Sequence, residues 1–231
     1  MALDVDRLGP ACALARQLGD AAGLLKVGSQ LFAAEGPRAV EKLAGLGAAI
    51  FLDLKFHDIP NTVAGAVAAA AQLPGVRMLT VHTTGGLAMM QAAREAVGRG
   101  KDTPALLGVT LLTSLDAAAL RKMGMSGAVE SRVISLARLA KRAGLNGVVA
   151  SSREAKSIRR ACGPKFIIAV PGVRPRTTSV QDQARVATPA EAIGAGADYL
   201  IVGRPITGAK NPRAAALAIA AEIAAASASA R

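Results

Sequence analysis

One strand–helix junction indicates the fold of this chain, and it has the sequence Ile50-Phe51-Leu52-Asp53-Leu54-Lys55-Phe56-His57-Asp58-Ile59-Pro60-Asn61-Thr62. The apolar run from Ala48 to Leu52 predicts a buried strand, because continuous apolar residues are typical of strands that are covered on both faces. Pro60 favours the first turn of a helix, where its missing N–H has no partner. We therefore expect a β/α unit here, with Asp58 as the N-cap of the helix.

The junction also carries an unusual group of charges. Side chains alternate along a strand, so Asp53 and Lys55 project to the same side at its carboxyl end, and Asp58 can return to the same ammonium. An ion pair beside a capping aspartate would be an ordinary structural interpretation. However, such a cluster is costly to desolvate and adds little stability, whereas perturbed charges in clefts are common at active sites. We therefore interpret the junction as a candidate active site.

The same alternation of strand and helix is repeated along the chain. Short apolar runs predict strands at Ala2–Val5, Leu24–Val27, Ala48–Leu52, Met78–Val81, Ala105–Leu111, Gly147–Ala150, Phe166–Val170 and Tyr199–Val202. The segments between them predict helices at Arg7–Leu18, Pro37–Leu46, Thr62–Gln72, Leu87–Val97, Glu130–Ala143, Arg153–Ala161, Thr188–Ala195 and Pro212–Ala225. Eight such units predict one α/β domain over residues 1–231, a (β/α)₈ TIM barrel.

Composition narrows the classes of protein that fit. The 231 residues carry a net charge of +12, but the Lys and Arg residues are scattered and indicate solvated helix faces rather than a nucleic-acid site. Four phenylalanines, one tyrosine and no tryptophan give little for base stacking, so RNA binding is a weak alternative. Two distant cysteines indicate small buried side chains, and the acidic start of the chain does not resemble a signal peptide. We expect a cytoplasmic protein with no membrane partner.

Polar and charged residues follow nearly every predicted strand, at the barrel face where active sites collect. They are Asp4, Lys26, Asp53, Lys55, His82, Thr113, Ser114, Ser151, Pro171-Gly172-Val173-Arg174 and Gly203-Arg204. The last two groups follow the seventh and eighth strands, where barrels bind phosphate. A glycine C-cap beside a surface arginine is the alternative for either one alone. Gln183 lies in a long loop, residues 176–186, that we expect to close over a ligand. We assign no proton-transfer role to His57 or His82.

These motifs closely resemble the orotidine 5′-phosphate decarboxylase family over essentially the whole chain. The resemblance rests on Ala2-Leu3-Asp4-Val5, Lys26-Val27-Gly28, Asp53 to Thr62, Val109-Thr110-Leu111-Leu112-Thr113-Ser114, Pro171-Gly172-Val173-Arg174-Pro175, Asp182-Gln183-Ala184-Arg185 and Val202-Gly203-Arg204-Pro205-Ile206-Thr207. It implies decarboxylation of orotidine 5′-phosphate to UMP and CO₂ in de novo pyrimidine biosynthesis, with no cofactor and no metal. It also implies a homodimer with shared active sites.

The resemblance further implies a role for each site residue. Lys55 would donate a proton to C6, within a charged array that includes Lys26, Asp53 and an Asp58 from the partner subunit, which also supplies Thr62. Asp4 and Lys26 would hold ribose hydroxyls, and Thr113 would contact the pyrimidine. The remaining substrate-binding residues, around the phosphate and its loop, would be Pro171, Arg174, Gln183, Gly203 and Arg204. The loop before Gln183 departs from the commoner glycine-rich version.

The nearest alternative is a Mg²⁺-dependent decarboxylase or aldolase-like enzyme of the same suprafamily that acts on sugar phosphates. The resemblance implies that those relatives carry a metal-binding glutamate where this chain has Lys26. An ammonium at that position would repel the cation, which favours the metal-free reaction. Loss of CO₂ would leave carbanion character at C6, and a preorganised ammonium is the group that would stabilise it.

Overall fold

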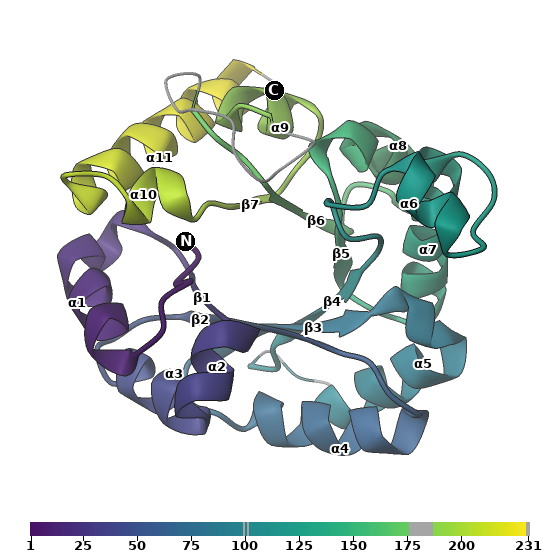
Figure 1. Ribbon diagram of the computed structural model, residues 1–231, viewed down its shortest axis with the longest axis horizontal. Coiled ribbons are helices and arrows are strands. Elements are labelled where there is room, and N and C mark those ends of the chain that lie inside the picture. The colour runs from purple at the N-terminus through teal and green to yellow at the C-terminus, as the bar shows by residue number, and fades with distance from the viewer. Residues whose placement is uncertain (99, 101, 176–186, 230–231) are drawn as a thin grey trace.

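The computed structural model describes residues 1–98, 100, 102–175 and 187–229. Its strands form a ring in which each pairs in parallel with the next, and helices form a second ring outside them (Figure 1). Strand order follows chain order from β1 to β7, so each connection crosses to the adjacent strand. This nearly closed parallel barrel confirms the predicted TIM-barrel class.

The strands are short and buried, as continuous apolar runs predict. Within the described ranges they are β1 Leu25–Gly28, β2 Ile50–Phe56, β3 Val76–His82, β4 Ala105–Val109, β5 Gly147–Val149, β6 Ile167–Pro171 and β7 Tyr199–Ile201. In β2 the first residues are fully buried and the last ones are half-buried, so the strand emerges from the core at its carboxyl end.

The segment predicted as the first strand, Ala2–Val5, closes the ring without forming a regular strand. Ala2 makes an isolated parallel bridge to Lys26, and its N–H donates to the carbonyl of Val202 at 2.7 Å. The N–H of Leu3 donates to the carbonyl of Lys26 at 3.0 Å. The segment therefore bonds to β1 on one side and to the residue that follows β7 on the other. Its pairing is confined to these few residues, which is why the structure has one strand fewer than predicted among the described residues.

The helices cover the outside of the strand ring. Those that correspond to predicted helices are α1 Leu8–Leu18, α3 Pro37–Ala44, α4 Pro60–Ala71, α5 Gly86–Val97, α7 Val129–Arg142, α8 Ser152–Cys162, α9 Pro189–Gly194 and α11 Pro212–Ser229, close to the predicted ranges. Short helices that the sequence did not predict are α2 Ser29–Glu35, α6 Ala117–Lys122, α10 Arg204–Thr207 and the 3₁₀ turns η1 Gly19–Ala21 and η2 Thr83–Gly85. They span too few residues to show a helical period. None of the helices in the described part of the chain is long and apolar enough to cross a membrane.

The start of α4 differs from the prediction that Asp58 is its N-cap. The helix begins at Pro60 and its N-cap is Ile59, with φ −59° and ψ 154°. A residue before proline is pushed out of the helical conformation by the proline ring, which fixes Ile59 as the boundary. Asp58 lies one residue outside the helix, where its Oδ1 accepts a 2.6 Å hydrogen bond from the N–H of Ile59.

Two apolar cores hold the barrel together. A smaller cluster fills the inside of the strand ring and is formed by Phe51, Met78, Leu107, Val109, Val149 and Ala169. The larger cluster packs the helices on the outside of the strands and consists mainly of Ala, Val, Leu and Ile. The core is therefore built mainly from small aliphatic side chains. The inner cluster reaches the carboxyl ends of β4 and β5 at Val109 and Val149, where polar residues from other strands lie beside it.

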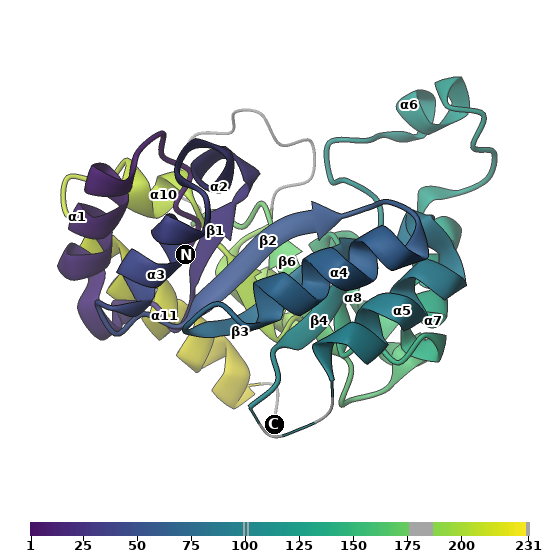
Figure 2. The same ribbon diagram turned by 90° about the horizontal axis from the view of Figure 1, so that it is seen from below.

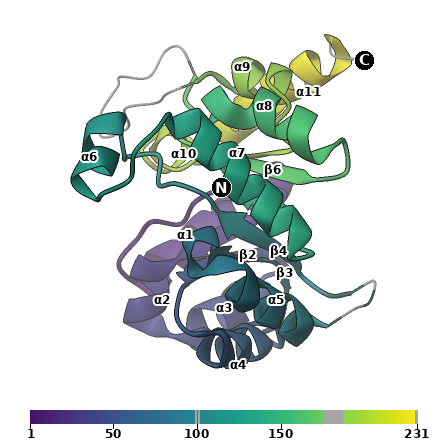
Figure 3. The same cartoon turned by 90° about the vertical axis from the view of Figure 1, so that its right-hand side faces the viewer.

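The loop between β4 and α7 stands away from the barrel at this carboxyl end. It carries α6, which projects beyond the ring of helices (Figure 2 and Figure 3). Met123, just after α6, is 56% exposed, and Leu112 at the base of the loop is 42% exposed. The face at the carboxyl ends of the strands is thus both the open end of the barrel and a surface with exposed apolar side chains.

Candidate active site

The carboxyl ends of the strands enclose a cavity of about 260 Å³. It brings together nine of the residues predicted for the site: Asp4, Lys26, Asp53, Lys55, Thr113, Pro171, Arg174, Gly203 and Arg204. They come from the amino-terminal segment, from β1 and β2, and from the segments after β4, β6 and β7. Parallel strands converge at one face, and this explains how residues up to 200 positions apart, Asp4 and Arg204, line one space.

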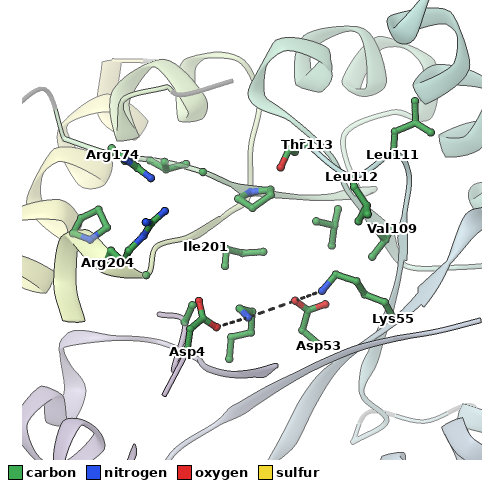
Figure 4. A pocket seen from close by; sticks show the side chains of 18 residues that line it. Asp4, Asp53, Lys55, Val109, Leu111, Leu112, Thr113, Arg174, Ile201 and Arg204 are labelled. Carbon is green, nitrogen blue, oxygen red and sulfur yellow. Dashed lines mark hydrogen bonds and ion pairs between the residues drawn. The ribbon is translucent and has the colours of Figure 1, made fainter. Parts of the chain in front are cut away.

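Charged groups of alternating sign form a continuous row along one wall. Lys26 Nζ lies 3.2 Å from Asp4 Oδ1 and 3.6 Å from Asp53 Oδ2, and Lys55 Nζ lies 2.9 Å from the same Asp53 oxygen. Asp53 is only 6% exposed, whereas the side chain of Lys55 is 35% exposed. Figure 4 shows Asp4, Asp53 and Lys55 along this wall. The buried carboxylate therefore fixes two ammonium groups and leaves that of Lys55 open to the cavity.

The backbone at Lys55 is in the left-handed region, with φ +52°, which no other non-glycine residue in the described ranges adopts. The pairing of β2 with β3 shifts register between Leu52 and Phe56, so the strand is irregular where Lys55 lies. A left-handed lysine costs about 1–2 kcal/mol, and such strain persists only where its surroundings hold it. The irregularity turns the end of β2 so that Lys55 and Asp53 reach the same cavity.

Thr80 of β3 is the residue that holds this conformation, and the sequence analysis missed it. Its fully buried hydroxyl donates to Asp53 Oδ1 at 2.9 Å and accepts from the N–H of Lys55 at 2.9 Å. One hydroxyl thus fixes both the carboxylate and the backbone of the lysine. A polar residue within the apolar run of a strand next to β2 was the available signal.

The opposite side of the cavity is positive. Arg174 and Arg204 extend into it from the segments after β6 and β7, across from Lys55 (Figure 4). Gly172 is the first residue after β6 and lies two residues before Arg174. It has φ +73°, a conformation that favours glycine. Among the described residues that line the cavity, the charges of Asp4, Lys26, Asp53 and Lys55 cancel and the two arginines leave a net positive charge. This end suits a dianion such as a phosphate.

An apolar surface lies between the two charged regions. Its side chains are Val109, Leu111, Leu112 and Ile201, and Thr113 adds a hydroxyl beside them. The sequence analysis predicted Thr113 but none of the apolar residues, because an apolar side chain at a strand end does not differ in sequence from one in the core. The arrangement offers a flat apolar body a place next to Lys55, with an anionic tail toward the arginines.

Of the residues predicted to act in catalysis or substrate binding, two that the structure describes do not line this cavity. Asp58 and Thr62 are exposed at the start of α4 and do not line it. Gln183, in the predicted closing loop, lies outside the described residues. Ser151 serves as the N-cap of α8, where its Oγ accepts from the N–H of Arg153 at 3.3 Å.

Burial changes the protonation of two groups near the site. It lowers the pKa of the Met1 amino group to about 6, and the positive charge of Lys26 acts in the same direction. It also lowers the pKa of His82 at the end of β3, with smaller contributions from the positive charges of His57 and Lys55. Both groups therefore favour their neutral forms.

The donor set of the cavity does not match a metal site. Within the described ranges there is no group of three or more His, Cys, Asp and Glu side chains placed to hold an ion. The Lys26 ammonium already lies between the carboxylates of Asp4 and Asp53, where it neutralises them.

Comparisons with known proteins agree on one family. A model of the orotidine 5′-phosphate decarboxylase / HUMPS family matches residues 1–219. Orotidine 5′-phosphate decarboxylase from Moorella thermoacetica is 53% identical over 229 residues, which cover 96% of this chain and 90% of the relative. The enzyme of that name from Nitrosococcus oceani is 50% identical over 223 residues, 96% of each chain. The crystal structure of orotidine 5′-phosphate decarboxylase from Lactobacillus acidophilus matches with a TM-score of 0.85 and 38% identity, over 96% of each chain.

Proposed function

Because the chain belongs to the orotidine 5′-phosphate decarboxylase / HUMPS family, we propose that it converts orotidine 5′-phosphate to UMP and CO₂ without a cofactor, with Lys55 as the proton donor to C6. The observation that carries this proposal is the row formed by Asp4, Lys26, Asp53 and Lys55 on one wall of a cavity whose other end is positive. Curated relatives at about half identity over nearly the whole chain carry the decarboxylase name.

The substrate fits the cavity in one direction. Its 5′-phosphate lies at Arg174 and Arg204, its ribose hydroxyls lie at Asp4 and Lys26, and its pyrimidine lies against the apolar surface with C6 toward Lys55. This orientation places the dianion at the positive end. It also places the bond that breaks beside the ammonium that Asp53 holds at 2.9 Å.

The reaction then consists of one bond cleavage, which needs no general base, and one proton transfer. The bond between C6 and the carboxylate breaks, the electron pair stays on C6, and neutral CO₂ leaves. A proton passes from Lys55 Nζ to C6, and solvent returns a proton to the amine. The Lys55 charge is fixed before the reaction by Asp53, and Asp53 by Thr80, so little reorganisation accompanies the charge that develops at C6.

The phosphate contributes to the rate as well as to affinity. It is remote from C6, and binding energy from a remote group can be used to close the site, exclude water and orient the reacting atoms. Two arginines from separate segments hold it, so loss of one leaves the other in place. This predicts a partial loss for a single substitution and a larger loss for a substrate without phosphate.

We also propose a homodimer in which each cavity is completed by the partner subunit. Asp58 and Thr62 lie outside their own cavity, at the exposed start of α4. Between them Ile59 is 65% exposed, and Leu112 at the rim of the cavity is 42% exposed. An exposed apolar residue flanked by two predicted site residues supports a contact between copies in which Asp58 reaches the partner's Lys55.

The alternative is the metal-dependent reaction on a sugar phosphate that the resemblance to the wider suprafamily leaves open. The position of Lys26 argues against it. Its ammonium contacts the carboxylate of Asp4 at 3.2 Å and that of Asp53 at 3.6 Å, and it would repel a divalent cation bound to either one.

The test is the absorbance-monitored loss of orotidine 5′-phosphate by protein treated exhaustively with a chelator. We expect full turnover, with UMP as the product and no gain on adding Mg²⁺. A chelated protein that is inactive and recovers with Mg²⁺, or one that turns over only a sugar phosphate, would replace the proposal with the metal-dependent alternative.

A further inference from the structure

His57 and His82 form a stacked pair at the edge of the site, and the mechanism above gives neither a task. Their ring centroids are 5.3 Å apart and the planes differ by 23°. His82 is the last residue of β3, and His57 follows directly after the end of β2. The pair therefore connects the end of β3 to the turn of residues 55–59, which carries both Lys55 and Asp58.

The ring of His82 is oriented from one side by Thr84. The N–H of Thr84 donates to Nδ1 at 3.5 Å, and the Thr84 hydroxyl lies 2.7 Å from the same nitrogen. As the acceptor of the backbone N–H, Nδ1 carries no proton, so the ring that fits this contact is neutral. Protonation of Nδ1 would break the bond to the Thr84 N–H and leave the Thr84 hydroxyl as the acceptor of the new N–H.

Lys55 brings a positive charge close to the pair. Lys55 from the end of β2 and the His57 ring from the turn both act on His82. Thr84 of η2 and Met89 of α5 are uncharged neighbours, and a Cβ added at Gly85 would meet both Met89 and His57. Asp58 follows His57 on the same turn. Two acids lie on this strand and turn: Asp53, whose carboxylate pairs with Lys55 at 2.9 Å, and Asp58, whose Oδ1 accepts from the N–H of Ile59. Neither forms an ion pair with His82 among the ion pairs described, so a positive charge on His82 adds to that of Lys55.

The turn itself has few other restraints. Lys55 is held by the bond of its N–H to Thr80, and Asp58 accepts only from the N–H of the next residue among the bonds described. The segment from His57 to Pro60 is exposed. The stack is thus a side-chain contact between the exposed half of the turn and a neighbouring strand, one residue from Asp58 and two from Lys55. The backbone adds the ladder pair of Phe56 with Val81 and the bond from the N–H of Val63 to the carbonyl of Ile59.

We propose that His82 is a positioning residue that, as a neutral ring stacked on His57, holds the turn carrying Lys55 and Asp58 in its reactive geometry. Protonation of His82 places an imidazolium beside Lys55 and His57, weakens the stack and displaces the turn. Activity then falls on the acid side. Because the pKa of His82 is lowered, we expect the loss of activity at a pH below the ordinary imidazole value of about 6.5. The part of this inference that concerns turnover rests on the proposed function.

Two substitutions separate the ring from its charge. His82→Ala removes the stack, and we expect kcat to fall about ten-fold or more while the dissociation constant of UMP changes less than about three-fold. His82→Phe keeps a ring against His57 but cannot be protonated. We expect it to recover a substantial part of kcat at pH 8 and to lack one ionisation of the wild-type kcat profile on the acid side. The substrate phosphate titrates equally in all three proteins and cancels in the comparison.

A measurement independent of turnover is amide hydrogen exchange at Lys55, whose N–H is bonded to Thr80. We expect exchange about ten-fold faster in His82→Ala than in His82→Phe at the same pH. Equal exchange, together with a kcat of His82→Ala near wild type, would overturn the proposal, as would an acid limb in His82→Phe that matches wild type. If no variant decarboxylates orotidine 5′-phosphate, the proposed function fails, and exchange at Lys55 alone decides whether His82 positions the turn. If His82→Ala does not fold, His82→Phe and its pH profile decide.

Discussion

The effect of removing the Thr80 hydroxyl can be worked out directly from the bonds that this hydroxyl makes. In Thr80→Val the shape of the side chain is kept, but two hydrogen bonds are lost: the one to the Asp53 carboxylate and the one from the Lys55 N–H, both 2.9 Å. The first is worth about 2 kcal/mol, because its acceptor is charged, and the second about 1 kcal/mol. The added methyl group regains about 1 kcal/mol in this fully buried position. We expect the free energy of unfolding to fall by about 2 kcal/mol.

Thr110→Val is the matched control for this measurement. Thr110 is also fully buried and its hydroxyl donates to one neutral group, the carbonyl of Val149 at 3.0 Å. That carbonyl keeps a second donor, the backbone N–H of Thr110 at 3.1 Å. We expect its free energy of unfolding to change by no more than about 0.5 kcal/mol.

Urea unfolding gives the free energy of unfolding of both variants, provided that its slope against urea concentration is the same in each. Steady-state kinetics gives kcat. We expect Thr80→Val to lower kcat at least about ten-fold, because Asp53 and the strained backbone of Lys55 lose their common partner, and Thr110→Val to keep kcat within about two-fold. If Thr80→Val is as stable and as active as Thr110→Val, Thr80 does not hold the charged row, and the reasoning from its two bonds is wrong.

Two further predictions concern the phosphate and the dimer. Arg204→Ala should lower kcat/KM for orotidine 5′-phosphate by one to two powers of ten, which corresponds to about 1.5–3 kcal/mol, and should change kcat/KM little for orotidine without its phosphate. An equal proportional loss on both substrates would show that Arg204 does not act through the phosphate. Mixing inactive Lys55→Ala and Asp58→Ala proteins should restore some activity, because a mixed dimer has one cavity with both native groups; no recovery after demonstrated subunit exchange would mean that the cavities are not shared.

The sequence predicted the barrel because its local signals and its repeated pattern agree. The apolar run before Asp53, the helix after it and the repetition of this unit define a parallel barrel without any knowledge of contacts. The missing strand at Ala2–Val5 shows the limit. An apolar run predicts where a chain is buried, but how many ladder bonds it forms depends on the spacing of the two edges that it joins.

Charged site residues were predictable for a similar reason, since Asp53, Lys55, Arg174 and Arg204 stand out against apolar strands. Residues that act through geometry were not. The role of Thr80 depends on the register of β3 against β2, and the register shifts near Lys55. The stack of His57 and His82 depends on the same irregularity. The wrong N-cap at Asp58 came from weighing a capping propensity above the constraint that Pro60 places on Ile59.

The most direct test of the account is the turnover of orotidine 5′-phosphate by Lys55→Ala, with UMP binding and thermal unfolding measured on the same protein. The cavity walls and the contacts of Asp53 with Lys26 and Thr80 remain in this variant. We predict a folded protein that binds UMP and shows no detectable decarboxylation, because the ammonium that stabilises the charge at C6 and supplies the proton is gone. Retention of about a tenth or more of the wild-type kcat would contradict the claim that Lys55 is the proton donor.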